Sequence, residues 1–412
     1  MKFDVKAQSA ELLKNLRYLQ SLSVEEYTFR KKWEELNDWI PANRDSVELA
    51  KHGIWEPSDF QDKARTLNTL ERLEPAIVFA DDDRLKQLWE IYRKFVSTAE
   101  YNQAPYRGIR FFIVDVQNRK TRRMADMLME WQVTKKGCAP LPWPVLGLAS
   151  VNSDFFTLDA RDQHIGWTHE DRKKGNLKHT AVGSTIVPTQ PFGYNFLGGK
   201  LIASLITTKA IRTEYQLRYR DVLVGMTTTS LYGGHSMYDG IPRWKNVGLS
   251  KGAMAIEPTA DIYKKWTSHL KVSKEEEYEA TNETTGAKSK KLALMFKEAG
   301  INPSDFNHGF ERGVYFSEFY ENTNEFLRGR CKDDDLKLKP EFSDFSEEVE
   351  GTKVRCDDDI EAIMRWWRPK AIERYQMLLK KSRLKTGKTF YDALSRLDYD
   401  TAWQQHKELV GR

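Results

Sequence analysis

Four short apolar runs limit the fold of this chain more than any other feature of its sequence. They are rich in β-branched and aromatic residues, and they cover Ile109–Val116, Pro144–Val151, Thr180–Val187 and Val222–Thr229. Runs of this kind, bounded by turn residues, predict strands. Helical patterns separate them, with one helix expected within Arg119–Trp131 and another from about Gly199 to Tyr215. The alternation predicts an α/β fold in which helices pack on a central mixed sheet.

Both flanks of this centre have apolar residues at helical spacing. Ser23 and Glu26 form a capping box at the start of one such run. A chain of 412 residues is long enough for two or three domains. We therefore expect a helical N-terminal lobe at residues 1–105 and an α/β core at 106–255. A mostly helical C-terminal region, with an acidic linker and a basic end, is expected at 256–412.

Composition excludes several classes of protein. Charged residues make up 30% of the chain, and no apolar run reaches the length of about 20 residues that a membrane helix needs. The start of the chain lacks the apolar core of a signal peptide. Cys138, Cys331 and Cys356 lie far apart and form no CxxC pair. We therefore expect a cytoplasmic protein with no membrane partner, no disulfide framework and no metal site.

The distribution of charge near the C-terminus indicates a polyanionic partner. The net charge is only +5, but an acidic segment at residues 331–359 precedes a basic one at residues 365–388. Aromatic residues interleave with the basic ones, as they do on surfaces that contact phosphates and bases. We expect this stretch to bind nucleic acid, with DNA as the expected form, through Lys380, Lys381 and Arg383. A solvated helix face is the alternative.

A glycine-rich passage lies between the third and fourth predicted strands. It reads QPFGYNFLGGKLIAS from Gln190 to Ser204, and its glycine pair precedes the predicted helix. The first amides of a helix have no intrahelical partner and attract anions, and glycine lets a phosphate approach the backbone. The candidate phosphate or cofactor contacts are Gln190, Gly193, Gly198, Gly199, Lys200 and Ser204. A plain strand-to-helix turn is the alternative.

The first half of this passage resembles the acyl-CoA loop of the GNAT acetyltransferases. Gln190-Pro-Phe-Gly193 matches the start of the GNAT pattern, and the glycine pair begins five positions after Gly193. The resemblance implies that acetyl-CoA or another acyl-CoA is a candidate cofactor. It also implies a tyrosine acid after the next strand, for which Tyr238 is preferred, and His235 is a candidate base. The alternative for Tyr238 is packing against Trp244.

A second resemblance covers residues 108–252. Arg161-Asp-Gln-His-Ile-Gly-Trp167, Leu201-Ile-Ala-Ser204, Leu223–Ser230 and Tyr238 with Trp244–Gly252 are similar, in order and spacing, to the DruA family. That family takes its name from the Druantia anti-phage system. Threonines stand where its fourth-strand motif has acidic residues. The resemblance implies a GNAT-like sheet, a role in phage or anti-phage biology, and other protein subunits as partners.

The first of these motifs offers a second nucleic-acid contact. The Arg161 guanidinium could form two hydrogen bonds to an anion, and the Trp167 ring could stack on a base. Arg172, Lys173 and Lys174 are close by in sequence. The alternative is an internal Arg–Asp ion pair beside a buried tryptophan.

Two functions follow from the sequence. The first is a DNA-associated, GNAT-like protein of the DruA family that serves as a nucleic-acid-binding subunit. The second is an active transferase that uses an acyl-CoA to modify nucleic acid or a component bound to it. The missing acids and the long loop favour the first function.

Overall fold

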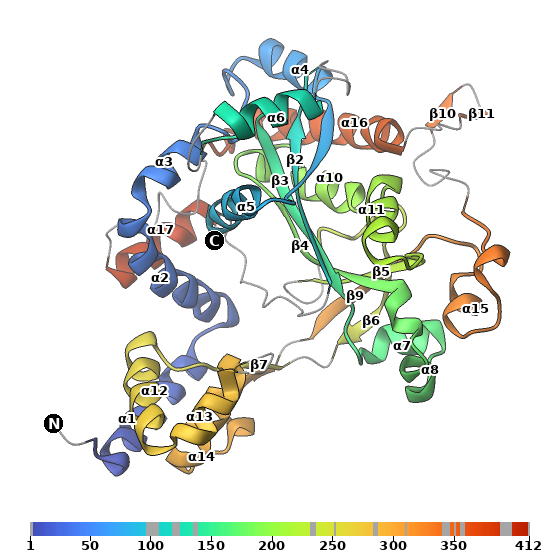
Figure 1. Ribbon diagram of the computed structural model, residues 1–412. Coiled ribbons are helices and arrows are strands. Elements are labelled where there is room, and N and C mark those ends of the chain that lie inside the picture. The colour runs from blue at the N-terminus through green and yellow to red at the C-terminus, as the bar shows by residue number, and fades with distance from the viewer. Residues whose placement is uncertain are drawn as a thin grey trace. The chain divides into compact units, whose positions relative to one another are not determined.

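A computed structural model describes residues 3–95, 107–117, 124–134, 139–230, 236–250, 253–282, 287–309, 311–339, 347–349, 352–354, 359–387 and 398–410. The chain forms two compact units (Figure 1). The first combines Met1–Trp39, Lys251–Glu311 and Arg396–Arg412, and the second combines Ile40–Ser250 and Arg312–Ser395. The mixed α/β class expected from the sequence is confirmed.

Where the structure describes the first unit, that unit is helical apart from one short β pair. Its elements are α1 (Val5–Ser21), the first part of α2 (Val24–Ala42), β7 (Ala253–Ala255), α12 (Ala260–Ser273), α13 (Glu275–Asn282), α14 (Ala287–Ala299), the 3₁₀ turn η3 (Pro303–Asp305), β8 (Asn307–Gly309) and α17 (Tyr399–Val410). Leu12, Leu16 and Leu19 line one face of α1 and pack with Trp266 and Met295 in the core of this unit. The spacing of these leucines is that of an amphipathic helix.

The second unit is built on a seven-stranded sheet. Its strands are β1 (Pro75–Phe79), β2 (Gly108–Asp115), β3 (Val145–Ser153), β4 (Thr180–Pro188), β5 (Gly225–Thr229), β6 (Lys245–Ser250) and β9 (Arg312–Glu318). The strand order is β1-β2-β3-β4-β5-β9-β6. Neighbours are antiparallel except β4 and β5, which pair in parallel over Thr180–Val182 and Gly225–Thr227. All four predicted strands are present. β1, β6 and β9 lie in segments for which no strand was predicted.

Helices cover the sheet. They are α3 (Arg44–Lys51), α4 (Lys63–Glu71), α5 (Asp83–Phe95), α6 (Met124–Thr134), α7 (Asp159–Ile165), α8 (His169–Lys173), α9 (Phe192–Asn195), α10 (Gly198–Leu205), α11 (Lys209–Tyr219), α15 (Thr323–Leu327) and α16 (Asp359–Lys380), with 3₁₀ turns η2 (Asn176–His179) and η4 (Asp333–Asp335). A separate short pair, β10 (Glu347–Val349) and β11 (Thr352–Val354), precedes α16. None of the helices in these ranges combines the length and apolar character that a membrane span needs.

The single helix expected after the glycine pair is two helices. α10 ends at Leu205 and α11 begins at Lys209. The hydroxyls of Thr207 and Thr208 donate to the carbonyl oxygens of Ser204 and Leu205. Threonine side chains that bond to nearby backbone compete with helix continuation, which accounts for the break.

Candidate functional site

The glycine-rich passage lies between β4 and α10, as the sequence predicted, but its glycines have packing roles. A Cβ on Gly198 would lie 2.5 Å from Phe192 Cδ1 and 3.0 Å from Gly193 Cα. Phe192 is fully buried. Gly198 is therefore required by the close approach of α9 to α10. A Cβ on Gly199 would meet Met237 Sδ at 2.9 Å, which is the end of a flexible side chain.

Other residues of the passage also have internal partners. The Gln190 side-chain oxygen accepts from the Tyr194 amide at 3.1 Å. Ser204 is fully buried and donates to the Lys200 carbonyl at 2.8 Å. The Lys200 amine donates to the Asp239 carbonyl at 2.5 Å. Among the residues predicted to contact a phosphate or cofactor, Lys200 is the charged one, and it lies at the start of α10.

The tyrosine expected to act as the acid of an acyl transfer is packed in the core. Tyr238 and Trp244 fill the space between α10 and β5, with their rings 5.6 Å apart. The Trp244 indole donates to the Ala203 carbonyl at 2.8 Å, and the Tyr238 hydroxyl lies 3.3 Å from Thr228 Oγ1. Burial raises the pKa of Tyr238, which makes it a weaker acid. The packing alternative is thus favoured for Tyr238. His235 lies outside the described residues.

The Arg-Asp-…-Trp motif forms a buried ion-pair network. Arg161 is fully buried and lies 2.9 Å from Asp154 and 2.6 Å from Asp162. Arg172 lies 2.9 Å from the other oxygen of Asp162. The Trp167 indole donates to the Leu327 carbonyl at 2.6 Å, and the ring is 7% exposed. Two arginines balance two aspartates here, so the arrangement favours the internal ion pair over contact with an external anion.

The two basic segments predicted to bind nucleic acid lie far apart in the second unit. Figure 1 places α8 and α16 at opposite ends of the sheet. At the end of α8, the exposed Lys173 and Lys174 form ion pairs with Glu170 and Asp171 at 3.6 and 3.5 Å. Their charge is locally compensated, unlike the charge beside α16.

The buried face of α16 fixes the helix on the rest of the unit. Trp367 and Tyr375 are fully buried; the Trp367 indole donates to the Leu197 carbonyl at 3.1 Å, and the Tyr375 hydroxyl donates to the Phe60 carbonyl at 2.8 Å. Arg368 donates from Nε and Nη2 to the Leu70 and Leu73 carbonyls, each at 3.1 Å. The opposite face, which includes Lys370 and Lys380, is exposed.

The chain turns back onto α9 directly after α16. Ser382 adopts the left-handed conformation (φ 51°), and the amides of Ser382 and Arg383 donate to the Leu379 and Leu378 carbonyls. This is the Schellman pattern of helix ends. The backbone of Lys385 then exchanges two hydrogen bonds with the Asn195 side chain, at 2.6 and 3.1 Å. The end of α16 is thereby tied to the glycine-rich passage.

This turn gathers cations around one tyrosine. Lys385 Nζ lies 4.3 Å and the Arg374 guanidinium 5.1 Å from the centre of the Tyr194 ring. Partial burial lowers the pKa of Lys385, and the nearby charges of Arg383 and Arg374 lower it further. Like charges held this close favour an anion between them.

Lys200 and Lys370 extend the cluster to the start of α10. Partial burial lowers the pKa of Lys200; nearby Asp239 opposes this effect, and Lys370 adds to it. We call the set the α16 basic cluster: Lys200, Lys370, Arg374, Lys380, Lys381, Arg383 and Lys385. Among the described residues, no member forms an ion pair with a carboxylate. Glu373 is the single acid between residues 362 and 388.

The comparison with protein families agrees with the sequence motifs. The family model described as Druantia protein DruA matches residues 138–329. The chain contains a DruA-family segment. The expected DruA resemblance is therefore confirmed. The DruA segment runs from before β3 to just beyond α15, so it includes the Arg161 network and the glycine-rich passage but ends before α16. No curated protein and no solved structure matches the chain significantly.

Proposed function

We propose that this protein is a nucleic-acid-binding subunit of an anti-phage defence system and that it holds the DNA backbone with the α16 basic cluster. The observation that carries the proposal is the absence of ion pairs from the cluster, among the described residues, in a chain rich in acids. Other lysines of the same unit do form ion pairs with nearby carboxylates, as Lys173 and Lys174 show.

The chemistry of the cluster suits a phosphate backbone. Lysine and arginine contacts to phosphates release condensed counterions, which gives affinity without base recognition. Both Tyr194 and Trp366 already have a cation near the ring, from Arg374 and Lys385 in one case and Lys370 in the other. Contacts to phosphates are therefore favoured over stacking on bases. The anti-phage role is supported by the DruA-family match.

The test is the salt dependence of DNA binding by the full chain. Each phosphate contact contributes about −0.9 to the slope of log K against log salt on duplex DNA. At least three contacts would give a slope of about −2.7 or steeper, measured by fluorescence anisotropy with a short duplex. A slope flatter than about −1, or no binding at low salt, would contradict the proposal.

Acyl transfer is the second candidate function, and one observation favours it. The glycine-rich passage lies between the end of β4 and the start of α10, which is the strand-to-helix position that the GNAT resemblance implies for an acyl-CoA loop. The filled space beside Tyr238 weighs against it. Acetyl-CoA at about 100 times its dissociation constant would stabilise a binding protein by about 2.7 kcal/mol. A rise in melting temperature of this origin would support the transferase.

A further inference from the structure

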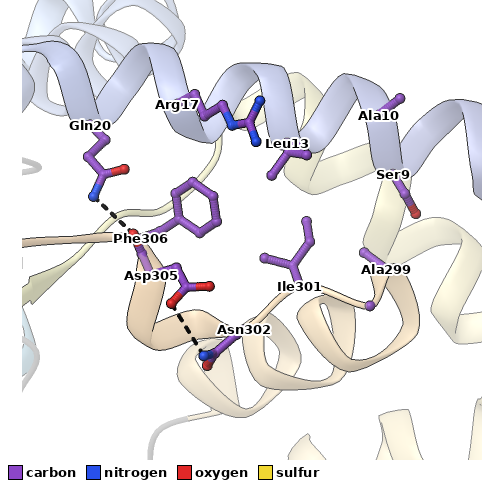
Figure 2. A pocket seen from close by; sticks show the side chains of 11 residues that line it. Ser9, Ala10, Leu13, Arg17, Gln20, Ala299, Ile301, Asn302, Asp305 and Phe306 are labelled. Carbon is purple, nitrogen blue, oxygen red and sulfur yellow. Dashed lines mark hydrogen bonds between the residues drawn. The ribbon is translucent and has the colours of Figure 1, made fainter.

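The helical unit contains an open cleft that is separate from the α16 basic cluster. It has a volume of about 490 Å³ and lies between α1 and the segment that follows α14. Figure 2 shows Leu13 and Arg17 of α1 facing Ile301, Asp305 and Phe306. Cavities of roughly 300–1,000 Å³ are typical of ligand sites.

The walls of the cleft follow from local sequence. On α1, the residues that line it recur at helical spacing, next to the leucine face that enters the core: Ser9, Ala10, Leu13, Arg17 and Gln20. On the other wall, α14 ends in a Schellman motif. Gly300 has a φ of 67°, and the Gly300 and Ile301 amides donate to the Lys297 and Phe296 carbonyls. This motif turns Ile301 into the cleft.

One hydrogen bond joins the two walls at one end, and a second fixes the turn on one wall. The Gln20 amide donates to the Asp305 carbonyl at 2.9 Å (Figure 2). Asn302 caps η3 by accepting from the Ser304 amide at 3.2 Å. The walls of the cleft are thus joined by a hydrogen bond of the chain itself, and the turn on one wall is fixed by a cap.

The floor is apolar and the rim carries one uncompensated cation. Phe306 is 7% exposed, while Leu13 and Ile301 are partly buried against the same core. Arg17 is exposed and forms no hydrogen bond or ion pair with the described residues. Asp305 lies on the wall opposite Arg17, and its carboxylate accepts from Asn302 at 3.3 Å. It retains capacity to accept from backbone N–H groups.

We propose that this cleft binds a segment of a partner protein in which an apolar side chain adjoins a carboxylate. The apolar side chain lies against Leu13, Ile301 and Phe306, and the carboxylate pairs with Arg17. Arginine suits this role because its planar fork binds carboxylates through two parallel hydrogen bonds. A carboxylate is assigned to the partner segment because its charge complements that of Arg17. This proposal does not depend on the proposed binding of nucleic acid.

The test uses the full chain with methyl-labelled isoleucine and leucine. The probe is the dipeptide acetyl-Leu-Leu with a free carboxylate, and its C-terminal amide is the matched control ligand. The Leu13 and Ile301 methyl signals are expected to shift saturably with the acid. The affinity is expected to fall about tenfold with the amide, because the amide cannot form the charge-assisted hydrogen bonds of a carboxylate.

The protein variants separate charge from structure. Arg17→Gln is expected to weaken acetyl-Leu-Leu binding about tenfold. Lys14→Gln, an equal charge change at an exposed position of the same helix, is expected to leave it unchanged. No saturable shift up to about 10 mM dipeptide would overturn the proposal. Equal binding of the acid and the amide, or equal effects of the two variants, would overturn it as well.

Discussion

The guanidinium of Arg161 lies 2.9 Å from the carboxylate of Asp154, and neither side chain is exposed to solvent. Asp162 and Arg172 complete a network in which two positive and two negative groups compensate one another. Thr227 also donates to Asp154, at 2.8 Å, which ties β5 to the network. These contacts connect α7 and α8 with the end of β3 and with β5.

Removing Arg161 is expected to damage stability. Arg161→Ala leaves the two buried carboxylates with one cation, Arg172, which contacts Asp162. The loss of one member of a buried ion pair costs about 3–5 kcal/mol. Urea denaturation measures this loss. The control is Lys173→Ala on the surface of α8, for which we expect a change within about 0.5 kcal/mol. If Arg161→Ala abolished function at an unchanged urea midpoint, Arg161 would instead be a recognition residue.

The two adjacent glycines are expected to respond differently to substitution. In Gly198→Ala the new methyl group meets the Phe192 ring and the Gly193 backbone, and overpacking of this kind costs about 1–3 kcal/mol. In Gly199→Ala the one close contact of the new methyl group is with the Met237 sulfur, which can move, while its other neighbours lie 4.0 Å away. The melting temperature should therefore fall clearly for Gly198→Ala and little for Gly199→Ala. Equal melting temperatures with equal losses of phosphate binding would restore the phosphate-loop interpretation.

The strands that could be predicted are those whose apolar runs are contiguous in sequence. β2, β3 and β4 coincide with such runs because they are central and buried on both faces. The position of β9 in the sheet, between β5 and β6, could not be predicted. It depends on backbone pairing with residues more than 60 positions away in the sequence. Its run Gly313–Phe316 is a local signal for the strand alone.

The candidate site was predictable only in part for the same reason. The basic composition of the chain around α16 is visible in the sequence. The proximity of Lys200 to Lys370, and of Lys385 to Tyr194, could not be predicted. Each pair brings together segments that are about 170 or more positions apart in the sequence. The burial of Arg161 had one local signal, Asp154, an acid seven positions earlier, but sequence does not show that both side chains point inward.

DNA affinity is expected to decrease at alkaline pH, and the decrease should begin at a lower pH than exposed lysines would give. The pKa values of Lys200 and Lys385 are lowered, so these lysines lose their charge at a lower pH than exposed lysines, which titrate near 10.4. A lysine that has lost its charge no longer attracts a DNA phosphate, so the affinity falls. Anisotropy titrations at constant salt from pH ~7 to ~10 measure the decrease.

Arginine variants provide the control for this pH dependence. Lys200→Arg with Lys385→Arg keeps both charges throughout that range, because arginine has a pKa above about 12. The double variant should show a flatter pH profile than the natural chain. An identical profile would mean that neither lysine contacts the DNA.

Charge reversal at the end of α16 is expected to weaken binding to all DNA sequences alike. Lys380, Lys381 and Arg383 are exposed and have no ion pairs among the described residues, so their replacement by glutamate removes phosphate contacts without breaking internal ones. The slope of log K against log salt should flatten by about 0.9 for each phosphate that the variant no longer neutralises. The matched control reverses Lys264, Lys271 and Lys290, which are exposed on α12 and α14 of the helical unit. It produces the same change in net charge, so any effect of net charge alone appears in both variants. If both reversals reduced affinity and slope equally, long-range attraction would explain the binding and the α16 basic cluster would not be the interface.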